Sequence, residues 1–257
     1  MSSKDQFLYI LLGFITLITV SCNEEPYSLE KETSALVLIK KNYQEGLYDK
    51  AIELAREFKA RYPYAHSNIE IDLVIANSHF KLREYLESTL YFTRFIKLYP
   101  HHPEKPYAMY QVGRCYWEEA PGAVDREQDS TIKAVTQWKK LIASHPKSPY
   151  ATKARVLMKR GERRILESQK LIMSYYCNNG FWASCAYRAL DIQKNYPHYP
   201  KAKKEALKLS GKAFKKLAKN KRSGKKEKNL YSDKFSADEL EKRANIFLEE
   251  AQKLSIE

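Results

Sequence analysis

The chain has 257 residues, a formal net charge of +14 and only 8 glycines. A composition poor in glycine and rich in Ala, Leu, Lys and Glu favours helices. The charge is uneven: residues 201–228 hold thirteen Lys or Arg against two acids, so the rest of the chain is nearly balanced and a uniformly basic protein is excluded.

The chain begins with an apolar run, Phe7 to Val20, of 14 residues. A helix needs roughly 17 to 25 apolar residues to cross a bilayer, so this run is too short to span one. Its length is typical of the central region of a secretory signal peptide.

A cysteine follows the run directly. Residues 19–22, TVSC, resemble a bacterial lipobox, in which a peptidase cuts before the cysteine and the thiol receives a diacylglycerol. The resemblance implies a lipoprotein signal over 1–21, an acylated Cys22 and a lipidated tether over 22–32. A plain signal peptide and a buried helix are the alternatives. The asparagine after Cys22 favours the outer membrane, by resemblance to the enterobacterial sorting rule.

The basic segment 201–228 raises the question of a partner. An exported protein does not meet the genome, so we expect no nucleic-acid binding. The charge fits anionic lipid head groups, a polyanionic envelope polymer or an acidic protein surface. A solvated helix face that continues into a disordered basic linker is the equally weighted alternative.

Three cysteines remain after Cys22, an odd number for an oxidising compartment. Cys177 and Cys185 are close enough in sequence to pair across a helical turn, but their spacing does not establish the geometry of a disulfide. We expect all three, with Cys115, to be buried free thiols that act as small apolar residues.

Four segments repeat one pattern, in which a small residue precedes a proline by twelve positions. The pairs are Ala51 and Pro63, Ser88 and Pro100, Ala134 and Pro146, and Cys185 and Pro197. Twelve residues make about three helical turns, a small side chain lets a second helix approach, and proline ends the helix. Each segment is therefore predicted to end one helix of a pair.

The preceding helices repeat as well. Two sets of residues recur at intervals of 37: Lys40, Asn77 and Arg114, and Tyr43, Phe80 and Trp117. Val112-Gly113-x-x-Tyr116 matches part of the tetratricopeptide-repeat (TPR) pattern, which the chain resembles. We predict an all-α TPR solenoid of about five helix pairs over 33–218, because helix pairs without a private core must stack on their neighbours. The recurring prolines rule out one long coiled coil.

Three further features complete the predicted organisation. Residues 118–131 enlarge the turn of the third repeat into a loop, and the segment from Tyr150 to Tyr176 reads as one long helix, kinked at Gly161. After a basic linker over 219–234, an amphipathic helix over 235–257 starts with a capping box. Its apolar stripe either caps the last repeat or docks on a partner.

The sequence offers no catalytic set. It contains no HExxH, CxxC or glycine-rich phosphate loop, and its two SxxK spacings lack partner motifs. We expect no enzyme activity, no cofactor and no metal. Instead, the two ladders predict a groove for an extended peptide along the first three repeats, lined by Lys40, Tyr43, Asn77, Phe80, Arg114 and Trp117. The alternative is that the rings are inter-repeat core and the polar residues are merely solvated.

Several motifs also resemble the BamD family of TPR lipoproteins, which belong to the outer-membrane β-barrel assembly (BAM) complex. The matching runs are AVDREQD, HPKSPYATKAR and SYYCNNGFWASCAYRALDIQKNYP. At the family's motif positions stand Asp125, Arg126, Asp129, Ser148, Tyr150, Ala154, Tyr175, Tyr176, Trp182 and Arg188. Cys185 stands where the family usually has alanine, and the basic tail has no match.

The resemblance implies a lipid-anchored protein on the periplasmic face of the outer membrane. It implies binding of a BamA-like barrel insertase through the C-terminal repeats, contact with other assembly lipoproteins, and capture of unfolded outer-membrane proteins at the N-terminal half. Asp125, Arg126, Asp129, Tyr175, Tyr176, Trp182 and Arg188 are the implied partner-binding residues. The other readings are a TPR scaffold for cell-wall synthesis or division enzymes, and a solenoid-bearing lytic enzyme, against which the missing catalytic domain argues.

Overall fold

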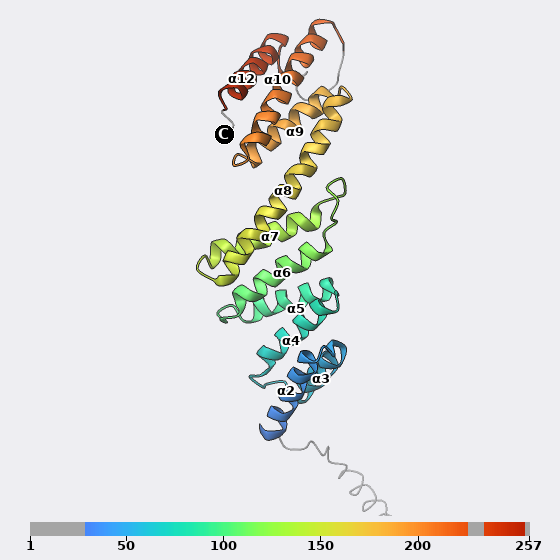
Figure 1. Cartoon of the computed structure of the whole chain (residues 1–257), viewed down its shortest axis with the longest axis vertical. Coiled ribbons are helices and arrows are strands. Elements are labelled where there is room, and N and C mark those ends of the chain that lie inside the picture. The colour runs from blue at the N-terminus through green and yellow to red at the C-terminus, as the bar shows by residue number, and fades with distance from the viewer. Residues whose placement is uncertain (1–28, 226–233, 255–257) are drawn as a thin grey trace, which may run out of the picture. The chain divides into compact units, whose positions relative to one another are not determined.

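The computed structural model describes residues 29–225 and 234–254, and these residues are helical with short connections (Figure 1). Cys22 and the predicted signal peptide lie outside the described residues. The helices are α2 (Leu29–Gln44), α3 (Tyr48–Arg61), α4 (Asn68–Lys81), α5 (Tyr85–Leu98), α6 (Lys105–Glu119), α7 (Asp129–Ser144), α8 (Pro149–Asn178), α9 (Trp182–Asn195), α10 (Pro200–Arg222) and α12 (Ala237–Lys253).

The chain forms two compact units, which divide within α4 after Val74. In the first unit, α2 packs against α3. In the second, α5 to α10 each pack against the next helix along the chain, and α12 packs against α10. The predicted all-α TPR fold is confirmed, with helices ending at the expected prolines.

The repeat is visible in the contacts as well as in the sequence. Tyr43 and Tyr48 meet edge to face in the first unit, with ring centroids 5.6 Å apart. Phe80 and Tyr85, each 37 residues later, form the same contact in the second unit at 5.5 Å. Edge-to-face pairs are a favoured aromatic geometry, so both turns are closed by the same interaction.

The small residues that precede the prolines lie where the helices pack. All four are fully buried, at 0% exposure: Ala51, Ser88, Ala134 and Cys185. The Ser88 hydroxyl also donates a hydrogen bond of 2.9 Å to the Ala76 carbonyl. Gly113 is the extreme case, because a Cβ placed there would overlap the indole of Trp138. These residues therefore set how closely neighbouring helices approach.

The long helix and the enlarged loop are both present. α8 is helical over 30 residues, and residues 120–128 lie outside the helices between α6 and α7. Gly161 lies inside α8, where a Cβ would come within 2.5 Å of the Val135 side chain. The glycine thus serves close packing of α8 on α7, where the sequence suggested a kink.

The C-terminal helix caps the array, as one of the two sequence-based alternatives predicted. Ser236 and Glu239 form the complete capping box. Leu240 and Ala244 are fully buried, and Phe247 stacks on Phe214 of α10 at 5.6 Å. Gly211 of α10 lets α12 approach closely, because a Cβ at this position would lie 2.6 Å from the Leu248 side chain.

Two predicted boundaries were wrong. α10 continues to Arg222, through the first four residues assigned to the basic linker. α2 starts at Leu29, inside the predicted tether. In α10 the lysines face outward while Ala, Leu and Phe fill the buried side, so a run that looks like a linker by composition is held as helix by its apolar stripe.

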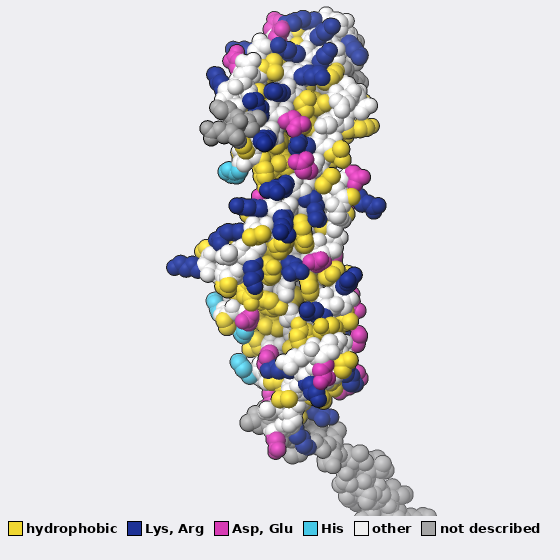
Figure 2. Space-filling view, in the orientation of Figure 1, with side chains coloured by type: hydrophobic (Ala, Val, Ile, Leu, Met, Phe, Trp, Pro, Cys, Tyr) yellow, Lys and Arg dark blue, Asp and Glu magenta, His cyan; other side chains and the backbone are white. Residues whose placement is uncertain are grey.

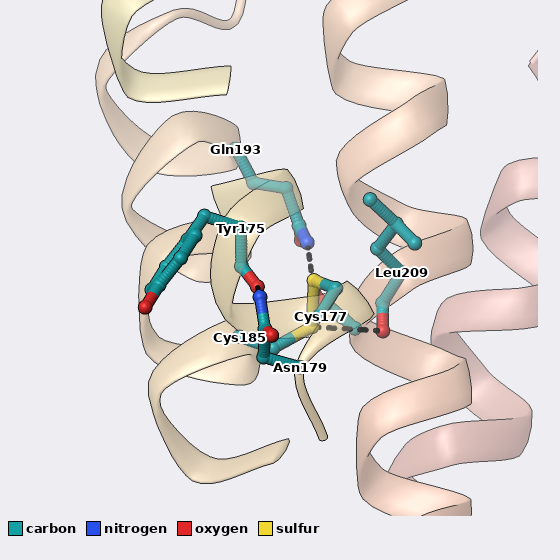
Figure 3. Close-up of a disulfide and its surroundings, with 7 residues drawn as sticks. Tyr175, Cys177, Asn179, Cys185, Gln193 and Leu209 are labelled. Atoms are coloured by element: carbon teal, nitrogen blue, oxygen red, sulfur yellow. Dashed lines mark hydrogen bonds between the residues drawn. A yellow bond between two sulfur atoms is a disulfide. The ribbon is translucent and has the colours of Figure 1, made fainter. Parts of the chain in front are cut away.

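The prediction of three free thiols was also wrong. Cys177 and Cys185 form a disulfide, with their Cα atoms 4.9 Å apart (Figure 3). Gly180, at φ +78°, lets the chain reverse between α8 and α9 and so brings the two helix ends together. The spacing of the two cysteines in the sequence does not by itself predict this geometry. Cys115 is free and buried, and burial raises the pKa of its thiol.

Replacing Gly113 with alanine should destabilise the second unit. The added methyl group would overlap the buried Trp138, and overpacking of this kind costs roughly 1–3 kcal/mol in the free energy of unfolding. Gly122→Ala is the matched control, because nothing lies within 4 Å of a Cβ at that position. Urea unfolding followed by circular dichroism measures both; equal stabilities would contradict the packing role of Gly113.

Candidate functional site

In the first unit, the two predicted groove residues already have partners. The Lys40 ammonium forms an ion pair of 2.7 Å with Glu70, and both side chains are partly exposed. Tyr43 packs on Tyr48, and burial, followed by the proximity of Tyr48, raises the pKa of the Tyr43 phenol. Lys40 is thus at the surface, but a ligand carboxylate would have to compete with Glu70.

In the second unit, Asn77 is held by the next repeat. The Tyr107 hydroxyl donates to the Asn77 side-chain oxygen, and the Gln111 amide donates to the Tyr107 oxygen over 2.9 Å. This chain of hydrogen bonds joins α4 to α6. Asn77 therefore contributes to the contact between repeats, which the sequence-based groove did not anticipate.

Phe80 and Arg114 contact each other directly. The Arg114 guanidinium lies 5.3 Å from the centre of the Phe80 ring and also pairs with Glu118 at 2.8 Å. Burial of the guanidinium disfavours its charge, but the interactions with Glu118 and Tyr110 together outweigh this, and the pKa of Arg114 is raised. The two residues form one cation–π pair, which keeps the charge near an aromatic face.

Trp117 links α6 to its neighbours. Its ring lies 6.0 Å from that of Trp138, and the Arg164 guanidinium of α8 lies over it at 4.1 Å. Arg164 also donates to the Pro121 carbonyl over 3.3 Å. Trp117 thus joins inter-repeat packing to the position of the loop that follows α6.

The loop over 120–128 presents two of the family-motif residues, Asp125 and Arg126, to solvent. A buried glutamine that sequence reasoning missed organises it. The Gln128 amide donates to the Ala123 and Arg126 carbonyls, each over 2.9 Å, and its oxygen accepts from the Thr131 hydroxyl at 2.8 Å. Gln128 lies inside the loop predicted over 118–131, and no motif marked it for this role.

Asp129 is exposed at the first position of α7. A carboxylate there interacts favourably with the helix dipole. Its position beside Asp125 and Arg126 in the chain gives this surface a mixed charge.

The second set of motif residues lies at the α8–α9 corner, which we define as residues 175–188. Tyr175 is 60% exposed, and its ring meets that of Tyr176 at 5.6 Å. Tyr176 in turn meets Phe181, which is 54% exposed, at 6.0 Å. Half-exposed aromatic side chains held by one another present apolar area at low entropic cost, which is what protein-binding sites use.

Trp182 and Arg188 complete this corner. The Lys212 and Lys216 ammonium groups of α10 lie 5.9 and 6.0 Å from the centre of the Trp182 ring. Arg188 donates to the Gln169 side chain of α8 over 3.3 Å. The Cys177–Cys185 disulfide crosses the corner (Figure 3). It covalently closes the turn that carries Phe181 and Trp182. Phe181 and Tyr187 are exposed here as well, and the sequence motif did not single them out.

Among the described residues, no group of three or more His, Cys, Asp and Glu side chains is arranged to hold a metal ion. No helix in the described ranges has the length and apolar character to cross a bilayer. The described residues do form an aromatic corner at 175–188 and a charged loop at 120–128.

Comparisons with known proteins agree with these motifs. The profile of a family described as an outer membrane lipoprotein, YfiO, matches residues 30–230. Outer membrane protein assembly factor BamD of Caulobacter vibrioides is 28% identical over 63% of the chain, which spans only 51% of that protein's length. BamD of Vibrio cholerae is 24% identical over 68% of the chain and 76% of its own length. Among solved structures, the yeast Sti1 TPR2AB domain is similar over 88% of this chain and 84% of its own, with 14% identity and a TM-score of 0.45.

Reducing the disulfide should loosen the α8–α9 corner. For a loop of this size, the chain-entropy model gives about 2–3 kcal/mol of stabilisation. We expect a phosphine reductant to lower the free energy of unfolding of the native chain by this amount, seen as a lower urea midpoint. A Cys177→Ala/Cys185→Ala variant should be less stable and indifferent to the reductant; sensitivity in that variant would assign the effect to another group.

Proposed function

The chain belongs to the BamD family of outer-membrane lipoproteins, and from this membership we propose that it is an assembly factor for outer-membrane β-barrel proteins. In this role it would bind a BamA-like insertase and unfolded barrel substrates, and promote substrate folding and insertion. The observation that carries the proposal is the match over residues 30–230 together with the aromatic corner at the family's motif positions.

The α8–α9 corner is the proposed site for the insertase. Tyr175 and Phe181 are more than half exposed; Phe181 lies on the turn that the disulfide closes, and Tyr175 lies two residues before Cys177 in α8. Rigid, exposed aromatic residues lose little conformational freedom on binding, and this favours affinity. The charged loop with Asp125 and Arg126 is the proposed contact for the insertase or for other assembly lipoproteins.

The N-terminal repeats are the proposed site for substrate. An unfolded barrel strand has unpaired backbone groups and alternating apolar residues, which polar and aromatic side chains together suit. In the first unit, Lys40 is engaged in a partly exposed ion pair with Glu70. Exposed ion pairs contribute little to stability, so a ligand carboxylate can replace Glu70 at small cost.

The proposed location is the periplasmic face of the outer membrane, with Cys22 as the lipid anchor. The protein would act without a cofactor and without nucleic acid. Its proposed contribution is a set of surfaces, which agrees with the absence of any catalytic grouping among the motifs identified in the sequence.

Affinity isolation from gently solubilised envelopes tests the main proposal. The native chain should co-purify a barrel protein that carries periplasmic repeats. Tyr175→Ala should lower that recovery about tenfold, since loss of an aromatic anchor typically costs over 1 kcal/mol. Tyr64→Ala is the matched control, because Tyr64 is 98% exposed and lies in the other unit. Recovery of cell-wall synthases or hydrolases in place of a barrel protein would support the scaffold reading instead.

A peptide ending in a barrel-type C-terminal strand tests the substrate site separately. It should bind the purified chain, and Lys40→Ala/Asn77→Ala/Arg114→Ala should weaken binding at least tenfold by removing polar partners of its backbone and carboxylate. The control, Lys41→Ala/Asn195→Ala/Arg160→Ala, removes exposed residues of the same types outside the ladder. Unchanged affinity in the ladder variant, measured by fluorescence anisotropy, would refute this assignment.

A further inference from the structure

α10 carries a row of lysines on the side opposite its core. Its buried side is apolar, with Leu207, Phe214 and Leu217. The outward positions form the lysine stripe, which we define as Lys208, Lys212, Lys215, Lys216 and Lys219, all exposed. At 1.5 Å per residue the stripe extends over roughly 17 Å along the helix. The sequence alone left open whether these charges bind a partner or form a merely solvated face, and the structure places all five on one helix.

Three acidic groups of α10 and α12 pair with cations outside the stripe. Glu205 pairs with Lys170 at 3.2 Å, and Asp238 and Glu241 of α12 both pair with Arg222, at 2.7 and 2.5 Å. Within the described part of the chain, none of the five stripe lysines takes part in an ion pair. Over the surface formed by α8 to α12 in Figure 2, Lys and Arg outnumber Asp and Glu. Within the described residues no ion pair neutralises the stripe lysines, so their positive charge is available to an outside partner.

Aromatic side chains lie beside the stripe. The Trp182 ring lies near the Lys212 and Lys216 ammonium groups, and Phe181, next to it in the chain, is 54% exposed. Lysines beside aromatic rings are the combination found at the boundary between lipid head groups and water, where the rings sit at head-group depth.

The residue type points to lipid phosphates and away from a carboxylate-bearing protein. Every member of the stripe is lysine, a mobile point charge that needs no fixed partner geometry. Specific carboxylate partners favour arginine, whose fork makes two parallel hydrogen bonds. Fluid head groups offer many phosphates in no fixed arrangement, which suits five flexible ammonium groups on one helix face.

We propose that the lysine stripe of α10 binds the phosphate-bearing head groups of an anionic phospholipid surface. The contact is peripheral, because the apolar side of α10 is already buried against α9 and α12. It adds a second membrane contact on the chain's own folded part, and it goes beyond the proposed assembly role because it requires neither insertase nor substrate.

The test uses the chain from residue 23 onward, which contains every described helix and lacks the predicted acylated cysteine. It should sediment with phosphatidylglycerol vesicles at low salt and not with phosphatidylcholine vesicles. The stripe variant is Lys208→Gln/Lys215→Gln/Lys219→Gln, which leaves the two lysines near Trp182 unchanged. It should bind the vesicles roughly a hundredfold more weakly, because each lysine near an anionic surface strengthens binding about fivefold. Added salt should weaken binding by the native chain in the same direction.

Lys140→Gln/Lys147→Gln/Lys159→Gln is the matched control, with the same loss of three charges at exposed positions outside α10. Circular dichroism checks that both variants fold. Equal losses in the two variants would reduce the effect to net charge and overturn the proposal, as would no binding to anionic vesicles. Binding to polyglutamate, measured in parallel, distinguishes a lipid surface from an acidic protein surface. If the stripe variant no longer binds polyglutamate but still binds anionic vesicles, the stripe faces an acidic protein and the proposal is overturned. If the native chain binds anionic vesicles but recovers no insertase from envelopes, the result contradicts the proposed assembly role and leaves the lipid contact supported.

Discussion

Close approach of neighbouring helices at small residues is the constraint on which the rest of the structure depends. Buried clusters are shared among several helices, as in the one formed by α8, α9, α10 and α12, so each helix is stabilised by packing on its neighbours. Gly113 against Trp138, Gly161 against Val135 and Gly211 against Leu248 are the points where a single methyl group would force helices apart. The positions of the α6–α7 loop and of the α8–α9 corner follow from these contacts, because both are turns between helices that the contacts hold in place.

The sequence predicted the helices well and their contacts poorly, for a physical reason. Prolines and small residues are local signals, so the helix ends, the long α8 and the capping box at Ser236 were predictable. A disulfide depends on how two helix ends meet, and a spacing of eight between Cys177 and Cys185 does not specify that. The extent of α10 was missed because a high lysine content obscured the apolar stripe that makes it a helix.

The candidate sites show the same limit. A period of 37 places Asn77 and Arg114 at equivalent points of α4 and α6, and likewise Phe80 and Trp117. It does not reveal that the Tyr107 hydroxyl binds Asn77 or that Arg114 stacks on Phe80, since those contacts depend on side-chain reach between repeats. Gln128, which holds the charged loop by three hydrogen bonds, carries no motif at all. The motif residues of the corner were recognisable because they recur in a known family, and no periodicity pointed to them.

The bond between Cys177 and Cys185 links the stiffness of one surface to the compartment in which the chain resides. Cytosolic reductants keep thiols reduced, whereas the oxidising cell envelope allows disulfides to form. A newly made copy that has not left the cytosol therefore has a turn held only by packing and hydrogen bonds, such as that from the Asn179 amide to the Tyr175 carbonyl. For the proposed location at the outer membrane, it follows that Phe181 and Trp182 gain their covalently closed turn only after export, where the proposed partner is found.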